Sequence, residues 1–235
     1  FAIQSPGQAG LFIARKQTQG RGRSGRHFHS DIASGLYLSV VFQPQVTDLE
    51  EVPQYTLLAA SAMVSALEAA SGQKVRIKWV NDLFCRGRKI AGILTEATTD
   101  IESRSLSSII IGIGLNLSGD FSQAEAATQS VAGTLFGQEM PTNFNPNQVI
   151  HDYLKQLAYY IRTLSDKTYL PHYEEHLLGV GRQVSYQQAG QEYTGIIQGI
   201  TDQGHLLVQD PHGQIRTLFS QEVHFSSQQF ADDLD

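Results

Sequence analysis

The chain has 235 residues, of which 41% are hydrophobic, and a formal net charge of −6 at neutral pH. This length can bury one large core and a smaller appendage. The acidic balance argues against a general nucleic-acid-binding protein, because such proteins need a basic face. The one cysteine, Cys85, excludes an internal disulfide and favours a reducing, cytoplasmic location. No apolar run reaches the roughly 18 residues that span a bilayer, and the amino end lacks a leader-like pattern, so we expect a soluble chain.

The first part of the chain predicts strands and helices in alternation. Apolar residues at 11–14 and 36–42 predict two buried strands on either side of a polar loop. The alanine-rich segment 56–71 has apolar residues at helical spacing and stops at Gly72, which predicts a helix. Further strands are predicted at 75–79, 90–94 and 109–113.

The pattern changes near Leu178. Before it, Asn145-Pro146 forms a favourable N-cap and first turn for a helix with one apolar face. After it, short strands separated by turns predict a small all-β module, which a closed or nearly closed barrel would protect at its edges. We therefore predict a first domain at 1–177 and a second at 178–235. The strands of the second are predicted at 183–186, 193–200, 205–209 and 215–219.

Residues 20–26, Gly-Arg-Gly-Arg-Ser-Gly-Arg, hold three glycines and three arginines in an acidic chain. Glycine lets backbone N–H groups approach a ligand, and guanidinium groups match phosphate and carboxylate oxygens, so the segment reads as an anion-binding loop. It lacks the spacing of a P-loop or of a dinucleotide fingerprint. A solvated arginine-rich loop is one alternative. An RNA-binding Arg/Gly segment is another, although hydrophobic sequence begins already at Phe28.

Three further clusters could carry chemistry. The first is Lys78-Trp79-Val80-Asn81-Asp82, in which a predicted strand ends in the polar pair Asn81 and Asp82. Strand ends are common places for a binding site. Lys89 stands at the start of an apolar strand, and glycines interrupt another strand at 112–116, where a ligand or backbone could approach closely. Each has a plain alternative: a core tryptophan followed by a turn, an exposed lysine, and a strand bulge.

The four motifs, at 17–26, 78–82, 89–94 and 112–116, closely resemble in sequence and order those of the biotin protein ligases. The carboxyl-terminal β module also resembles theirs, so the resemblance covers about residues 11–225. It implies an α+β fold, in which a mixed sheet flanked by helices is related to the class II aminoacyl-tRNA synthetases. An SH3-like β-barrel is expected to follow.

The resemblance implies an ATP-dependent biotin–[acetyl-CoA-carboxylase] ligase. Biotin and ATP would form biotinyl-5′-AMP and pyrophosphate, and a lysine of the biotin carboxyl carrier protein domain of acetyl-CoA carboxylase would then attack the mixed anhydride. The first step brings two anions together, which requires preorganised positive charge. Magnesium is expected with ATP, held mainly by phosphates and water without dedicated protein ligands. We expect no membrane or nucleic-acid partner, and a homodimer is compatible with the resemblance.

The resemblance also implies which residues form the site, through their positions in the family motifs. Catalytic roles are implied for Lys89, Arg21 and Asp82. Binding of biotin and the adenylate is implied for Gln17, Gly20, Arg21, Gly22, Arg23, Lys89, Gly92 and Leu94. Binding of ATP and its phosphates is implied for Arg23, Arg26, Lys78, Asn81 and Asn116. Lys89 would bridge the biotin carboxyl and the phosphate, and Asn116 would lie near adenine. Asp82 could orient a lysine, bind magnesium through water or accept a proton from the incoming amine.

The chain departs from the family pattern in places. Residues 1–10 do not match the family's Ser-Thr-Asn segment, so either this segment precedes Phe1, as we expect, or the pocket is incomplete. This sequence also contains no winged helix, and Val80 replaces a common proline. The lipoate protein ligases share the fold and the adenylation chemistry, but the motifs at 20–26 and 78–82 fit biotin ligases better. The non-enzyme alternative is a nucleic-acid-binding module, which would use the arginines without needing Lys89 or Asn116.

Overall fold

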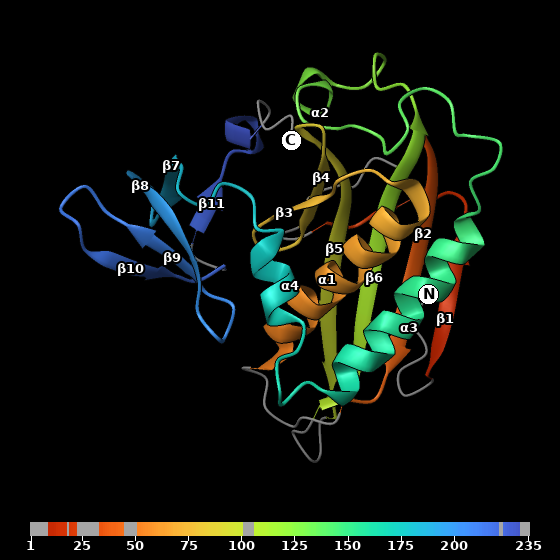
Figure 1. Cartoon of the computed structure of the whole chain (residues 1–235), viewed down its shortest axis with the longest axis horizontal. Coiled ribbons are helices and arrows are strands. Elements are labelled where there is room, and N and C mark those ends of the chain that lie inside the picture. The colour runs from red at the N-terminus through yellow and green to blue at the C-terminus, as the bar shows by residue number, and fades with distance from the viewer. Residues whose placement is uncertain are drawn as a thin grey trace.

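The described residues form a six-stranded sheet covered by helices and a separate five-stranded sheet (Figure 1). The computed structural model describes residues 9–17, 19–22, 33–44, 51–100, 106–220 and 223–230. In spatial order the strands of the large sheet are β1 (Gly10–Ala14), β2 (Ala33–Phe42), β6 (Leu106–Gly119), β5 (Arg88–Thr99), β4 (Asp82–Cys85) and β3 (Arg76–Lys78). Neighbouring strands of this sheet are all antiparallel, which confirms the α+β class. The described strands therefore form an antiparallel sheet and not the mixed sheet that the resemblance implied.

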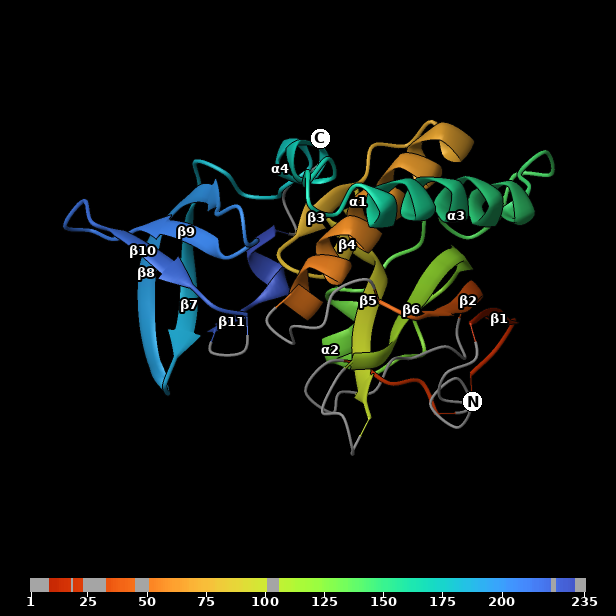
Figure 2. The ribbon, with the colours of Figure 1, turned by 90° about the horizontal axis from the view of Figure 1, so that it is seen from below.

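Helices α1 (Val52–Ser71), α3 (Pro146–Arg162) and the short α4 (Leu170–Glu175) lie along one face of the large sheet (Figure 2). Helix α1 is buried along most of its length, which its alanines permit because small side chains let it pack closely against both the sheet and α3. It ends as predicted, at Gly72 in the left-handed conformation, whose N–H donates to Glu68 O at 2.9 Å. The predicted cap of α3 is confirmed too, since the Asn145 side chain accepts from the Asn147 N–H at 3.0 Å.

Alternation along the strands gives the large sheet two different faces. Odd-numbered residues 109–117 of β6 are isoleucine or leucine and lie in the core beneath the helices. Even-numbered residues of the same stretch point to the other face, which we call the second face, and there β6 carries Gly112, Gly114 and Asn116. The glycines that the sequence placed in a strand therefore share one face of a central strand.

The carboxyl-terminal sheet consists of β7 (Gln183–Gln188), β8 (Gln191–Ile200), β9 (Leu206–Gln209), β10 (Ile215–Leu218) and β11 (Val223–Phe225), and a 3-10 turn follows at Ser227–Phe230. All four predicted strands are present, and the structure adds β11. The spatial order is β10-β9-β8-β7-β11, with each neighbouring pair antiparallel. The predicted small all-β module is confirmed.

A pair of histidines joins α4 to α1. The ring of His172 stacks on that of His176, with centroids 4.2 Å apart. Ser65 Oγ donates to Ser61 O at 3.1 Å and lies 3.1 Å from His172 Nε2, so this ring nitrogen is the donor. The other ring nitrogen, Nδ1, is buried and has no hydrogen-bond partner in the part of the chain that the structure describes. Burial, and secondarily His176, lower the pKa of His172.

Within the described ranges, no helix has both the length and the apolar character needed to cross a bilayer.

Candidate active site

A strip of glycine lies across the middle of the second face. The register places Gly92 of β5 beside Gly114 of β6, with Asp82 of β4 on one side and Tyr37 of β2 on the other. In the next row Gly112 lies between Leu94 and Ser39. A Cβ atom at Gly112 would meet Leu94 O at 3.6 Å and Ser39 Oγ at 3.8 Å, so the backbone tolerates a side chain there. The glycines instead leave the strip bare of side chains of its own, as a flat ligand would require.

An ion pair borders this strip. Lys89 Nζ lies 2.6 Å from Asp82 Oδ1, and the two side chains are 28% and 17% exposed. The Lys89 backbone is fixed on its other side, because its N–H donates to Val131 O and its carbonyl accepts from the Gly133 N–H, both at 2.9 Å. Sequence reasoning left several roles open for Asp82, and the structure brings its carboxylate onto the ammonium group.

Asn116 lies deeper in the same region, with only 5% of its surface exposed. Its Nδ2 donates to Gly133 O at 3.2 Å, whereas its Oδ1 is buried and has no hydrogen-bond partner among the described residues. A buried acceptor without a donor costs about 1–3 kcal/mol, so its retention calls for an explanation. A ligand N–H group would provide one.

The segment 131–135 connects these two residues, and sequence reasoning missed it. It runs along Lys89 on one side and along Asn116 on the other, where the Leu135 N–H donates to Asn116 O at 3.0 Å. A side chain at Gly133 would overlap that of Arg88, so this close approach requires glycine. The only sequence signal for this segment was the short apolar run at 131–132, which does not distinguish it from other buried loops.

The residues of Lys78–Asp82 are held by partners from other parts of the chain. Lys78 is 8% exposed, and its Nζ donates to Phe225 O at 3.1 Å. The sequence analysis assigned Lys78 to ATP and phosphate binding, and the structure places its ammonium group on this backbone carbonyl. Asn81 Nδ2 donates to Ile93 O at 2.8 Å, and the Ile93 N–H donates back to Asn81 O at 2.9 Å. The Trp79–Val80 peptide bond, within this segment, is cis.

Part of the arginine loop lies among the described residues. Gly20 is buried, Gln17 and Gly22 are half-buried, and Arg21 is exposed. Arg23 and Arg26, which the sequence assigns to phosphate binding, lie outside the described residues. Their predicted roles, like those of Gln17, Gly20, Arg21 and Gly22, stay predictions.

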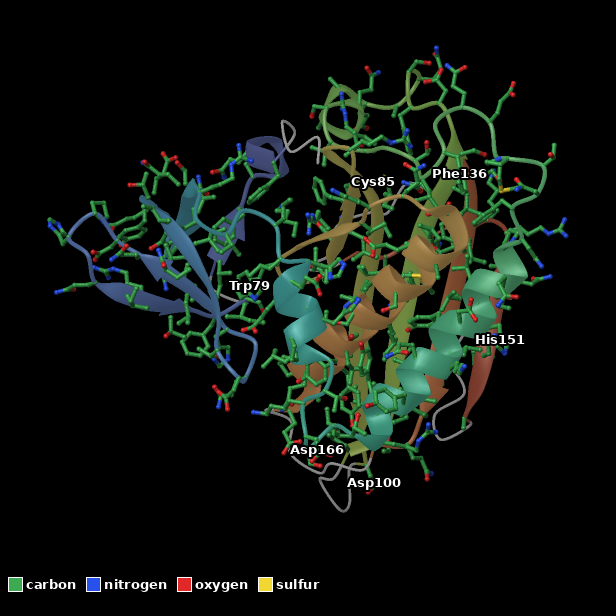
Figure 3. The ribbon with its side chains drawn as sticks, viewed as in Figure 1. Trp79, Cys85, Asp100, Phe136, His151 and Asp166 are labelled. Atoms are coloured by element: carbon green, nitrogen blue, oxygen red, sulfur yellow. The ribbon has the colours of Figure 1, made fainter. Side chains whose placement is uncertain are left out.

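No metal centre is formed by His, Cys, Asp and Glu in the part of the chain that the structure describes, where no three such side chains gather. Cys85, in β4, is a buried free thiol whose pKa is raised by burial. Figure 3 labels it, together with Trp79, which lies where the two sheets meet. Cys85 is therefore poorly suited to act as a thiolate ligand or nucleophile.

Two parts of the chain match families of known proteins. Residues 2–116 match the biotin/lipoate A/B protein ligase family, and residues 179–226 match the biotin protein ligase C terminal domain, which together account for more than half of the chain. The chain is 33% identical over 216 residues to the bifunctional ligase/repressor BirA of Bacillus spizizenii, covering 91% of this chain and 65% of that protein. It thus spans less than two thirds of the length of this relative.

Two further matches cover their counterparts more fully. A biotin–[acetyl-CoA-carboxylase] ligase of Paracoccus denitrificans is 28% identical over 228 residues, which are 94% of this chain and 93% of that protein. A biotin protein ligase from Aquifex aeolicus, solved in complex with biotin and ATP, superposes with a TM-score of 0.73 at 24% identity, covering 92% of this chain and 89% of that one. The fold is thus shared with that structure.

Proposed function

Since the chain belongs to the biotin/lipoate A/B protein ligase family, we propose that it is a biotin protein ligase. It would activate biotin with ATP to biotinyl-5′-AMP and then biotinylate a lysine of a carrier protein. The observation that carries this proposal is the Lys89–Asp82 ion pair, 2.6 Å long, at the edge of the bare glycine strip. A flat ring system fits over glycine backbone, and a lysine beside it can hold the carboxylate that reacts.

In the first step, a biotin carboxylate oxygen attacks the α-phosphorus of ATP, the bond from that phosphorus to the bridging oxygen breaks, and pyrophosphate leaves. Lys89 would place its charge between the carboxylate and the α-phosphate, which otherwise repel each other. Asp82 would orient the lysine, because its carboxylate already holds the ammonium group. In the second step, the carrier amine attacks the acyl carbon, AMP leaves, and the amine loses a proton.

Asn116 supports a place for the adenine. Its free Oδ1 is a buried acceptor, and the exocyclic amino group of adenine is a donor that could satisfy it. We propose that Arg21, Arg23, Arg26 and Lys78 contribute positive charge toward the phosphates, and that Gln17, Gly20, Gly22, Gly92 and Leu94 line the biotin and adenylate site. Magnesium would enter with ATP as part of the substrate. It would be held by phosphate oxygens and water.

The remaining assignments are proposals of the same kind. We place the boundary between the catalytic and carboxyl-terminal domains at 177/178, close to the start of the second family match at residue 179. The carrier would be the biotin carboxyl carrier domain of acetyl-CoA carboxylase, the enzyme named in the Paracoccus relative. A cytoplasmic location and a homodimer remain predictions, the first resting on the single free cysteine.

Mass spectrometry after incubation with biotin and MgATP tests the proposal. Biotinyl-5′-AMP should be retained on the protein, and addition of a carrier domain should shift the carrier by one biotin and release AMP. Lipoate in place of biotin is the control for the related ligases, and neither intermediate nor transfer should form with it. An adenylate formed with lipoate alone, or none with either acid, would refute a biotin ligase.

A further inference from the structure

We propose that Trp79 is a positioning residue, through which the carboxyl-terminal sheet fixes the Lys89–Asp82 pair for adenylation. This inference rests on the proposed function, because the reaction whose rate it concerns is biotin activation. Trp79 lies three residues before Asp82 in the chain. It acts through the three-residue connection, residues 79–81, that joins β3 to β4.

Trp79 is linked to the carboxyl-terminal sheet by a hydrogen bond and by a ring contact. Trp79 Nε1 donates to Gly204 O at 2.9 Å, across the boundary between the two sheets. Its ring also meets that of Phe225 edge-on, with centroids 6.1 Å apart. Trp79 thus contacts two separate parts of the carboxyl-terminal sheet, the β8–β9 turn and strand β11.

The acceptor carbonyl is held rigidly. Gly204 has a φ of +81°, and its N–H donates to Thr201 O at 2.8 Å within the β8–β9 turn. A Cβ at this position would come within 2.6 Å of Leu57 Cδ2 in α1, so the turn is packed against the helix. Trp79 is therefore anchored to a fixed point, as positioning requires.

The connection leaves little freedom between Trp79 and Asp82. Val80 O accepts from the buried Tyr173 hydroxyl at 3.0 Å, and Asn81 is clamped to Ile93 by two hydrogen bonds. Lys78 and Asp82, at the two ends, are paired in the hairpin. A shift of the backbone at Trp79 is therefore passed on to the strand that carries the carboxylate holding Lys89.

The same turn offers a matched control. Asp202, also in the β8–β9 turn, pairs with Lys167 at 2.9 Å, so it ties the carboxyl-terminal sheet to the segment between α3 and α4 and not to residues 78–82. Asp202→Ala removes one tie between the sheets without touching the hairpin. A general effect of loosening the sheets would appear in both variants, whereas positioning appears only when Trp79 changes.

The experiment measures single-turnover formation of biotinyl-5′-AMP. Trp79→Phe keeps an aromatic ring and removes the N–H donor, and we expect the rate constant to fall about tenfold with the KM for biotin within about twofold. Asp202→Ala should stay within about twofold of the parent. In an Asp82→Asn background, Trp79→Phe should have no further effect, because both changes act on the same pair. Since the chain has one tryptophan, incorporation of benzothienylalanine offers a second variant of nearly the same shape without the N–H.

Three results would overturn the proposal: equal slowing by Trp79→Phe and Asp202→Ala, effects of Trp79→Phe and Asp82→Asn that multiply, or a parental rate with the benzothienyl isostere. Hydrogen exchange gives a readout independent of catalysis. The Ile93 amide should exchange about tenfold faster in Trp79→Phe and at the parental rate in Asp202→Ala, and equal exchange in both would count against the link. If the parent forms no biotinyl-5′-AMP, the proposed function fails, while this exchange still decides whether Trp79 positions the hairpin.

Discussion

Replacing Lys89 with alanine separates its chemical role from its structural one. The Lys89–Asp82 pair is short, at 2.6 Å, but the side chains are 28% and 17% exposed, so solvent weakens the attraction. A pair of this kind contributes about 1 kcal/mol or less to stability. The backbone bonds of Lys89 to Val131 and Gly133 do not involve the side chain and remain. We therefore expect Lys89→Ala to fold normally.

The effect on the reaction should be much larger. Removing one preorganised charge from a developing anionic transition state costs about 3 kcal/mol, which is roughly a hundredfold in rate. Lys89→Arg should recover only part of this, because a planar guanidinium cannot take the position of an ammonium between two oxygens. The assay is single-turnover release of pyrophosphate from labelled ATP.

Lys167→Ala is the matched control, since Lys167 also pairs with an aspartate, at 2.9 Å, but in a different part of the molecule. It should leave the rate unchanged. If Lys89→Ala forms adenylate within about threefold of the parent while folded, the lysine does not stabilise the transition state. The charge would then have to come from the arginine loop.

Three further perturbations address the nucleotide site, pH and the boundary between the sheets. Asn116→Ala should weaken ATP binding about tenfold in calorimetry, because it loses about one hydrogen bond, and biotin binding should not change. An unchanged affinity for ATP would show that Asn116 does not bind adenine. Because burial lowers the pKa of His172, its contribution to stability is complete above the unfolded pKa of about 6.5 and is lost as the pH falls through the folded value. The urea midpoint of His172→Gln should therefore change less with pH below about 6.5 than the midpoint of the parent does. The same pH dependence in both proteins would contradict this. Gly204→Ala, at a φ of +81° and against Leu57, should cost about 1–3 kcal/mol in urea unfolding, and an unchanged midpoint would show that the turn can move.

Local patterns were sufficient to predict the main elements. Helix α1 was recognisable from alanine content, helical spacing and Gly72, although it starts at Val52, four residues earlier than predicted. Apolar runs and alternation predicted all strands of the large sheet except β4, although the predicted 109–113 strand extends over Leu106–Gly119. Strand β1 was expected to be buried, but Ile13 is 53% exposed. Element ends depend on pairing with neighbours, which a single strand's sequence does not specify.

The sequence predicted the motifs of the candidate site but not the contacts between them. Each cluster could be found along the chain, but the register that sets Gly92 beside Gly114 depends on long-range pairing. The hydrogen bond of Lys78 also depends on a long-range contact, because its acceptor, the Phe225 carbonyl, lies 147 residues later in the sequence. The segment 131–135 escaped notice because its function is carried by backbone groups, which have no sequence signature.

The position of Trp79 determines what the intrinsic fluorescence of this protein measures. As the chain's single indole, it lies half-buried at the meeting point of the two sheets, bonded to Gly204 and beside Phe225. Its emission responds to the polarity around one ring, so a red shift during denaturation reports that water has entered this boundary. Far-ultraviolet circular dichroism, dominated by the helices, reports the large domain instead. Where the two curves separate, the difference measures how much earlier the sheets part than the helices melt.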